Sequence, residues 1–281
     1  MSASMQGKIV LITGATSGIG LAMARELAAR GAHVTLVGRN AAKLATVAEQ
    51  IRTQTDNQHI ETILADLSTH AGVQLTAHEF KRRHTRLDVL INNAGAIYMS
   101  RQISADGLEM TFALNHLNYF HLTNLLLETL KSSAPARIIN VSSDAHRGHV
   151  IEFDNLQGEK SYSGWTAYGR SKLMNLLFTY ELARRLEGKG VTVNALHPGF
   201  VATGFGKNNG ALMRLAMRLI SPIARSAEEG AATGIYLACS LEVEGVSGKY
   251  FVDKQAVPSD PASYDQQTAQ RLWETSLELI A

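Results

Sequence analysis

Residues 13–20 read Thr-Gly-Ala-Thr-Ser-Gly-Ile-Gly, between an apolar run at 8–13 and a stretch with helical spacing at 19–30. Glycine suits a backbone that turns sharply and passes close to a phosphate, because a β-carbon would collide there. The following helix directs free N–H groups and its positive dipole end to the same place. The segment predicts a pyrophosphate-binding turn, although a glycine-rich turn without a ligand is the alternative. The predicted contacts are Gly14, Thr16, Ser17, Gly18, Ile19 and Gly20.

Outward from this turn, short apolar runs alternate with helical stretches along the whole chain. Runs that are apolar on both faces indicate a parallel sheet covered on both sides. Right-handed crossovers then give a doubly wound sheet. We therefore expect an α/β protein with a single Rossmann domain over residues 1–281, about seven strands, and helices on both faces. The further runs lie at residues 33–37, 60–65, 87–91, 136–141, 191–196 and 249–252.

The bulk composition excludes several classes of partner. A formal net charge of +2 over 281 residues gives no basis for binding nucleic acid. The single cysteine, Cys239, excludes an internal disulfide and suits a reducing compartment. We see no signal peptide and no apolar run of the roughly 20 residues that a membrane span needs. The sequence therefore predicts a cytoplasmic protein without an integral membrane segment.

The residues after the second and third apolar runs suggest which dinucleotide binds. Enzymes that use NAD typically place an acidic residue after the second strand, at the ribose 2′-hydroxyl. This chain has Arg39-Asn40 there, and an arginine can pair with a 2′-phosphate, as can Ser17. The pattern favours NADP(H) over NAD(H), with a surface arginine beside a helix cap as the alternative. Asp66, followed by Leu67, either accepts a hydrogen bond from the adenine or caps a helix near Ser68.

A candidate catalytic group follows in the second half of the chain. Ser142 and Ser143 end an apolar run, and Tyr168 and Lys172 lie four residues apart in a helical stretch at 165–185. Residues four apart share a helix face, so the ammonium lies beside the phenol. A free tyrosine has a pKa near 10, and a nearby positive charge lowers it. The spacing therefore predicts a tyrosine with a lowered pKa that transfers protons.

The order of these motifs resembles that of the short-chain dehydrogenases/reductases, and the resemblance covers nearly the whole chain. Within that family the chain is most similar to the retinol-dehydrogenase-like branch, which also has a longer gap between the serines and the tyrosine. The resembling segments are 13–20, Asn92-Asn93-Ala94-Gly95, 115–123, 140–146, the insertion at 153–162, 167–172 and Pro198-Gly199.

The resemblance implies a catalytic tetrad of Asn115, Ser143, Tyr168 and Lys172. Ser143 would hold the carbonyl oxygen, with Ser142 as a minor rival, and Tyr168 would protonate it. Lys172 would lower the tyrosine pKa and bind the nicotinamide ribose, and Asn115 would anchor a relay water. A buried asparagine satisfied by backbone is the alternative for Asn115. Further implied cofactor contacts are Asn93, Ala94, Gly95, Pro198, Gly199, Val201 and Thr203.

The remaining expectations concern the substrate, metal binding, the oligomeric state and the alternative function. The segment around 200–225 is rich in Leu and Met, which favours a lipophilic aldehyde, ketone or alcohol, unless it is a helix packed on the domain. No histidine spacing resembles a metal site; His146, His149 and His197 lie near the predicted site, to touch substrate or only to pack. The leading hypothesis is an NADP(H)-dependent oxidoreductase that interconverts carbonyls and alcohols. We also expect the protein to form a homodimer or homotetramer. The alternative is a catalytically silent NADP(H)-sensing protein.

Overall fold

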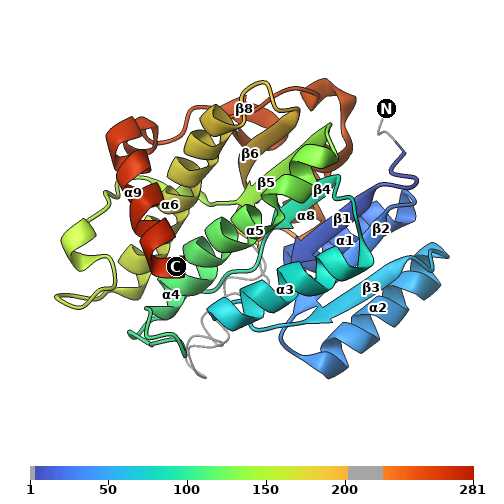
Figure 1. Ribbon diagram of the computed structural model, residues 1–281, viewed down its shortest axis with the longest axis horizontal. Coiled ribbons are helices and arrows are strands. Elements are labelled where there is room, and N and C mark those ends of the chain that lie inside the picture. Colours follow the sequence, from blue (N-terminus) through green and yellow to red (C-terminus); the bar gives the residue numbers. More distant parts are fainter. Residues whose placement is uncertain (1–3, 202–223) are drawn as a thin grey trace.

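One eight-stranded sheet organises the protein, in the order β3-β2-β1-β4-β5-β6-β7-β8 (Figure 1). The computed structural model describes residues 4–201 and 224–281. All neighbouring strands are parallel except β7 and β8, which are antiparallel. The strands are β1 Ile9–Thr13, β2 His33–Gly38, β3 Ile60–Leu64, β4 Val89–Asn92, β5 Ala136–Val141, β6 Val191–His197, β7 Lys249–Val252 and β8 Gln255–Val257.

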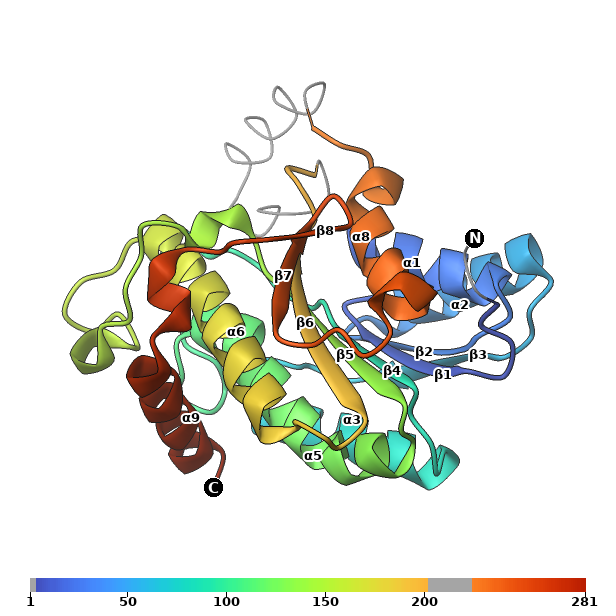
Figure 2. The ribbon, with the colours of Figure 1, turned by 90° about the horizontal axis from the view of Figure 1, so that it is seen from above.

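Helices cover both faces of the sheet, as expected for a doubly wound fold (Figure 2). Helices α1, α2 and α8 lie on one face, and α3, α5 and α6 lie on the other. The main helices are α1 Gly18–Ala29, α2 Ala41–Thr55, α3 His70–Arg83, α4 Met110–Phe112, α5 Asn118–Ser132, α6 Gly164–Arg185, α8 Ala227–Cys239 and α9 Gln266–Ile280.

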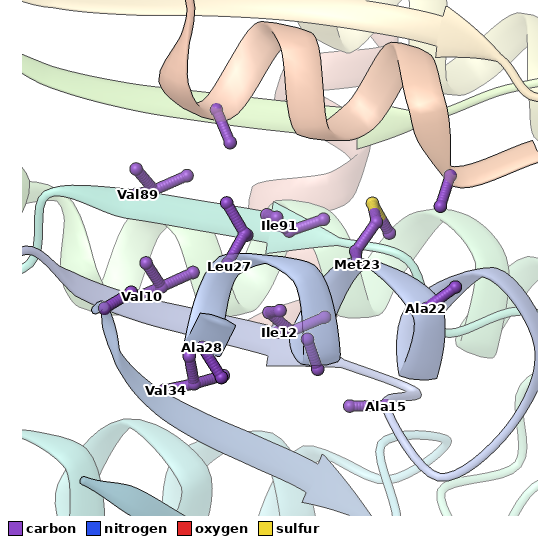
Figure 3. Packing of buried hydrophobic residues seen from close by; sticks show 14 of the residues in the cluster. Val10, Ile12, Ala15, Ala22, Met23, Leu27, Ala28, Val34, Val89 and Ile91 are labelled. Carbon is purple, nitrogen blue, oxygen red and sulfur yellow. The ribbon is translucent and has the colours of Figure 1, made fainter. Parts of the chain in front are cut away.

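The two faces of the sheet bury separate hydrophobic clusters. Figure 3 shows the first, in which Met23 and Leu27 of α1 lie over Val10, Ile12 and Ile91 of the strands. These side chains are fully buried, because the central strands are covered on both sides. The β-branched strand residues fill the space between the strands and the helices. This packing holds the sheet in place, and the candidate site lies at one end of that sheet.

The expected single-domain α/β fold with a parallel sheet is confirmed, and the part of the chain that the structure describes forms eight strands where about seven were expected. The additional strand, β8, has only three residues, two of them exposed. It turns back on β7 at Asp253 and Lys254, which both adopt positive φ angles of 50° and 66°. A strand this short and polar lacks the apolar run that predicts the others.

The C-terminal helix α9 packs against α6 and closes one end of the molecule (Figure 2). Trp273 of α9 contacts the rings of Phe120 on α5 and Phe178 on α6, with ring centroids 4.9 and 5.9 Å away. The helix therefore covers part of the surface of α6. Among residues 4–201 and 224–281, no helix combines the length and apolarity that crossing a bilayer would require.

The strand order determines where a ligand can bind. β2 and β3 lie on one side of β1 and β4 to β8 lie on the other, so the order reverses between β1 and β4. In open α/β sheets, ligands occupy the crevice beyond the carboxyl ends of the strands at this reversal. The predicted glycine turn follows β1 directly.

Candidate active site

A cavity of about 630 Å³ runs along the carboxyl ends of the strands. It collects most of the predicted residues from six separate loops and from α6. Thr203 lies outside the described residues, and Asn40 and Asn115 do not line the cavity. The predicted residues that line it are Gly14, Thr16, Ser17, Gly18, Ile19, Gly20, Arg39, Asp66, Leu67, Asn93, Ala94, Gly95, Ser143, Tyr168, Lys172, Pro198, Gly199 and Val201.

The glycine turn packs against the loop after β4 without room for side chains. Gly14 has a φ of +66°, and a β-carbon there would lie 2.8 Å from Ala94 Cα. A β-carbon on Gly20 would lie 2.5 Å from the carbonyl oxygen of Gly14. Asn93 fastens the two loops, since its Nδ2 donates to the carbonyl oxygen of Thr13 at 2.8 Å. The side chain of Asn93 thus shapes the cavity wall by holding backbone.

The amino end of α1 opens into this cavity. Ser17 occupies the N-cap position, but its side chain makes no capping hydrogen bond and is exposed. Gly18, the first residue of the helix, has a φ of +57°. A helix start with free N–H groups beside a glycine cradle that any β-carbon would fill fits a dinucleotide pyrophosphate. The residues present therefore fit the predicted cofactor.

The residues after β2 and β3 divide between the cavity and local structure. Arg39 is exposed and lines the cavity. Asn40 caps α2, because its side chain accepts a hydrogen bond from Lys43 N at 2.9 Å, and its expected cofactor contact stays a prediction. Asp66 Oδ1 accepts bonds from the amide and hydroxyl of Ser68 at 3.0 and 2.8 Å while Asp66 also lines the cavity. The adenine contact of Asp66 stays a prediction.

The two serines after β5 have different environments. Ser142 is buried, and its hydroxyl donates to the carbonyl oxygen of Lys172 at 2.8 Å. Ser143 is half-buried, and its hydroxyl oxygen accepts a bond from Ala145 N at 3.2 Å. A hydroxyl that accepts one bond still has its proton to donate. The hydroxyl proton of Ser142 is thus used in a hydrogen bond to α6, which favours Ser143 for the predicted contact with a substrate oxygen, and that contact stays a prediction.

Tyr168 and Lys172 lie together as their spacing predicts, but their pKa shifts differ from the expectation. Lys172 Nζ lies 5.5 Å from the centroid of the Tyr168 ring and donates to the carbonyl oxygen of Val141 at 3.1 Å. Burial raises the pKa of Tyr168 to about 12, although a hydrogen bond with Ser143 opposes the shift. Burial lowers the pKa of Lys172 to about 7. In the protein's own surroundings, desolvation outweighs the expected effect of the ammonium on the phenol.

A second tyrosine lies on the inner side of Lys172. The ring centroid of Tyr119, on α5, is 5.8 Å from Lys172 Nζ. Tyr119 is fully buried, and its hydroxyl has no hydrogen-bond partner within the part of the chain that the structure describes. Both rings contribute an electron-rich face near the amine, which favours its charged form.

Asn115 lies in a π-helical turn, η1 Ala113–Leu117, between α4 and α5. Its Oδ1 accepts from Ala96 N at 2.8 Å, and its Nδ2 donates to the carbonyl oxygen of Ala96 and to Ser171 Oγ at 2.9 and 3.0 Å. The side chain therefore fastens the loop after β4 to α6. This largely matches the alternative of a buried asparagine satisfied by backbone; the water relay stays a prediction.

Further residues line the cavity besides the predicted tetrad and cofactor contacts, and of these only Ser142 and His197 are candidates from the sequence. Trp165 lies one turn before Tyr168 on α6, so its helical spacing was a usable signal. His197 and Phe200 flank Pro198-Gly199. In the described part of the chain, no cluster of three or more His, Cys, Asp or Glu side chains could hold a metal ion. The others are Val37, Gly38, Ala65, Ala96, Leu114, Val141, Ser142, Asp144 and Ala145.

Comparisons with known proteins agree with this geometry. A family model described as short chain dehydrogenase matches residues 8–213. Retinol dehydrogenase 12 of Mus musculus is 45% identical over 274 residues, which cover 98% of this chain and 86% of that protein. Retinol dehydrogenase 14 of the same species is 46% identical over 290 residues, covering 98% and 86%.

Solved structures share the fold. One from Mycobacterium Paratuberculosis superposes with a TM-score of 0.80 at 32% identity, covering 99% of this chain and 95% of that chain. The RhlG/NADP active-site complex of Pseudomonas aeruginosa has a TM-score of 0.71 at 28% identity, covering 92% and 98%.

Proposed function

Because the chain belongs to the short-chain dehydrogenase family and is an alcohol/carbonyl oxidoreductase, we propose that it uses NADP(H) to interconvert a lipophilic aldehyde or ketone and its alcohol. One observation carries the proposal. Ser143, Tyr168 and Lys172 line the same cavity as the glycine turn and Arg39. A cofactor on the turn and a carbonyl at Ser143 therefore share one enclosed space.

The chemistry follows from the groups that face this space. When bound, the cofactor's nicotinamide ring supplies or accepts the hydride. Ser143, whose oxygen accepts from Ala145 N, keeps its proton and uses it to donate a hydrogen bond to the substrate oxygen. Tyr168, with a pKa of about 12, is protonated at neutral pH and can give its proton to the strongly basic oxygen formed by reduction. Lys172, which lines the same cavity, would bind the ribose hydroxyls of the cofactor.

The preference for NADP(H) rests on the loop after β2. Arg39 is exposed at the cavity, and no acidic residue stands beside it in Gly38-Arg39-Asn40. A guanidinium can make two parallel bonds to a phosphate, whereas an acidic residue is the usual partner of a ribose 2′-hydroxyl. The RhlG structure, whose fold this chain shares, is described as an NADP complex.

The proposal that the substrate is lipophilic is based on the side chains at the mouth of the cavity. Trp165 and Phe200 line the cavity, yet 55% and 51% of their surfaces are exposed. Large apolar side chains exposed together beside polar reacting groups are typical of sites for apolar ligands. The relatives' name, retinol dehydrogenase, refers to such a substrate. The predicted substrate segment at 200–225 extends from Phe200, and its residues 202–223 lie outside the described part.

Two further expectations belong to this proposal. We propose a cytoplasmic location, which cell fractionation tests. We also propose a homodimer or homotetramer, which light scattering after gel filtration tests. Because α9 packs on α6 through Trp273, only the surface of α6 that α9 leaves open could contribute to such an interface.

The experiment is NADPH and NADH oxidation by the purified protein against carbonyls ranging from short polar ketones to long-chain aldehydes and retinal. Tyr168→Phe is the control variant, expected to lose turnover by about 100- to 10,000-fold while binding NADPH normally, because that is the usual contribution of proton transfer by a positioned side chain. Turnover by both proteins would contradict the role of Tyr168. NADPH binding without turnover by the wild type on any carbonyl would favour the cofactor-sensing alternative.

A further inference from the structure

A fully buried histidine lies directly beneath Ser143. His146 ends the short helix η2, Asp144–His146, for which Ser143 is the N-cap. Its two ring nitrogens contact different parts of the chain. Nδ1 is 2.6 Å from the carbonyl oxygen of Ser143, and Nε2 is 3.0 Å from the backbone nitrogen of Asp260.

These two contacts determine which nitrogen of His146 carries the proton. A backbone N–H can only donate, so Nε2 must accept from Asp260 N and is unprotonated. A neutral imidazole has one N–H, which is therefore on Nδ1 and donates to the carbonyl oxygen of Ser143. Burial lowers the pKa of His146, so the neutral ring persists at neutral pH.

We propose that His146, as its Nδ1–H tautomer, is a positioning residue that holds the backbone of Ser143 so that the serine hydroxyl points into the cavity. The inference rests on the proposed function, because it gives Ser143 the substrate oxygen to bind. The carbonyl oxygen of Ser143 also accepts the backbone N–H of His146 at 3.1 Å. His146 thus donates two hydrogen bonds to this carbonyl, one from its backbone and one from its ring, and Ala145 N donates one to the hydroxyl oxygen of Ser143.

The histidine also connects Ser143 to the C-terminal part of the chain. Its ring meets the ring of Tyr250 edge-on, with centroids 5.2 Å apart. The Tyr250 hydroxyl donates to Asp144 Oδ1 at 2.9 Å, and Asp260 Oδ2 accepts from Gly148 N at 3.0 Å. These contacts hold the turn after β5 against β7 and against the segment after β8.

Burial keeps His146 neutral against several groups around it that favour its protonated form. Burial is the largest influence on its pKa and lowers it, as does Arg147, while the hydrogen bond to the Ser143 carbonyl, Asp144 and Asp260 raise it. His197, on β6, and Tyr250, on β7, complete the surroundings. A protonated ring would carry an N–H at Nε2, facing the N–H of Asp260, and that hydrogen bond would be lost.

The test uses three variants with different hydrogen-bonding ability. In His146→Asn the amide nitrogen can replace Nδ1 as donor to Ser143, whereas in His146→Gln the amide oxygen can replace only the Nε2 acceptor. His146→Leu replaces neither. We expect His146→Asn to keep kcat within about threefold of wild type, and the other two to lose about tenfold, the value of one ordinary hydrogen bond. The NADPH dissociation constant should stay unchanged in all three.

The opposite ranking, with His146→Gln active and His146→Asn impaired as far as His146→Leu, would overturn the inference. So would equal activity of all three variants. A second measurement on the wild-type protein needs neither folding of a variant nor turnover. The ¹⁵N chemical shifts of His146 should show a protonated Nδ1 and an unprotonated Nε2 at pH 7. The other tautomer, or the imidazolium, would overturn the inference, whereas absence of wild-type turnover would count only against the proposed function.

Discussion

At the scale of single residues, burial rather than charge pairing dominates the catalytic group. Tyr168 and Lys172 are both shifted towards their neutral forms, with pKa values of about 12 and 7. The spacing of the two residues predicted their proximity but not these shifts, because spacing carries no information on how much water reaches a side chain.

The buried hydroxyl of Tyr119 predicts a gain in stability. Because it has no partner within the described residues, it costs roughly 1–3 kcal/mol of desolvation. We expect Tyr119→Phe to raise the free energy of unfolding by about 1 kcal/mol, measured by urea denaturation. The matched control is Tyr180→Phe, which removes a bond to Ser259 of 2.7 Å and should lower stability. A loss of stability in Tyr119→Phe would show that the hydroxyl is satisfied.

The exposed guanidinium of Arg39 predicts a change in cofactor preference. Arg39→Asp should lower the ratio of kcat/KM for NADPH to that for NADH on the order of 100-fold, since about 3 kcal/mol of charged hydrogen bonding to phosphate is lost. Lys43→Asp makes nearly the same charge change on exposed α2, away from the cavity, and should leave the ratio unchanged. If Arg39→Asp left this ratio of kcat/KM values unchanged, Arg39 would not bind the 2′-phosphate.

At the scale of elements, the apolar runs predicted the parallel strands because buried strands need continuous apolar residues. Three features had no such signal. β8 is too short and too exposed to show an apolar run. The π-helical turn at Asn115 depends on a backbone hydrogen-bonding pattern rather than on composition. Asn40 caps a helix, and an asparagine at this position suits capping and cofactor binding equally well. The candidate site was predictable where glycine or helical spacing fixes geometry, and not where two roles compete for one polar residue.

The close contact between the β1–α1 turn and the loop after β4 predicts sensitivity to one methyl group. In Gly14→Ala, the new β-carbon would lie 2.8 Å from Ala94 Cα, so one loop must move. We expect NADPH binding to weaken at least about tenfold, as the phosphate cradle depends on close backbone approach. Calorimetric titration measures it.

The control for this prediction separates strain from collision. Gly107 also has a positive φ, +78°, but a β-carbon there would have nothing within 4 Å. Gly107→Ala should therefore cost some stability yet leave NADPH binding unchanged. Equal binding by both variants would show that the cradle tolerates a β-carbon.

At the scale of the whole molecule, the two edges of the sheet have different tasks. The carboxyl edge carries the candidate site, whereas the amino edge carries a larger groove of about 870 Å³ with none of the predicted site residues. Asp88, nearly completely buried at this edge, pairs with Lys8 at 3.0 Å and Arg86 at 2.6 Å and accepts from Ile9 N at 2.9 Å. These contacts join β1 and β4.

Asp88 predicts acid-dependent stability without an effect on catalysis. Burial alone would raise its pKa, but Arg86, the Ile9 amide and Lys8 together lower it. A lowered pKa stabilises the fold above the unfolded value near 4, and this contribution disappears as the pH falls through the folded value. Asp88→Asn should cost about 2 kcal/mol at pH 7, much less near pH 3, with kcat unchanged.

Urea unfolding at both pH values measures this effect. Asp154→Asn is the control, since Asp154 forms an exposed pair with Lys160 and should change little. A penalty for Asp88→Asn that is the same at pH 3 and pH 7 would contradict the role of the charge.

His146 connects the backbone of Ser143 to that of Asp260, and this connection affects the order in which parts of the protein can fold during synthesis. Synthesis proceeds from the N-terminus, so β1 to β4, with the glycine turn, emerge first and can fold early. The partners that steady the turn after β5 come from β7 and from residues after β8, which are translated last. A nascent chain can thus form its glycine turn and the loop after β4 well before the turn after β5 is held in place, so we expect no turnover before the chain is released.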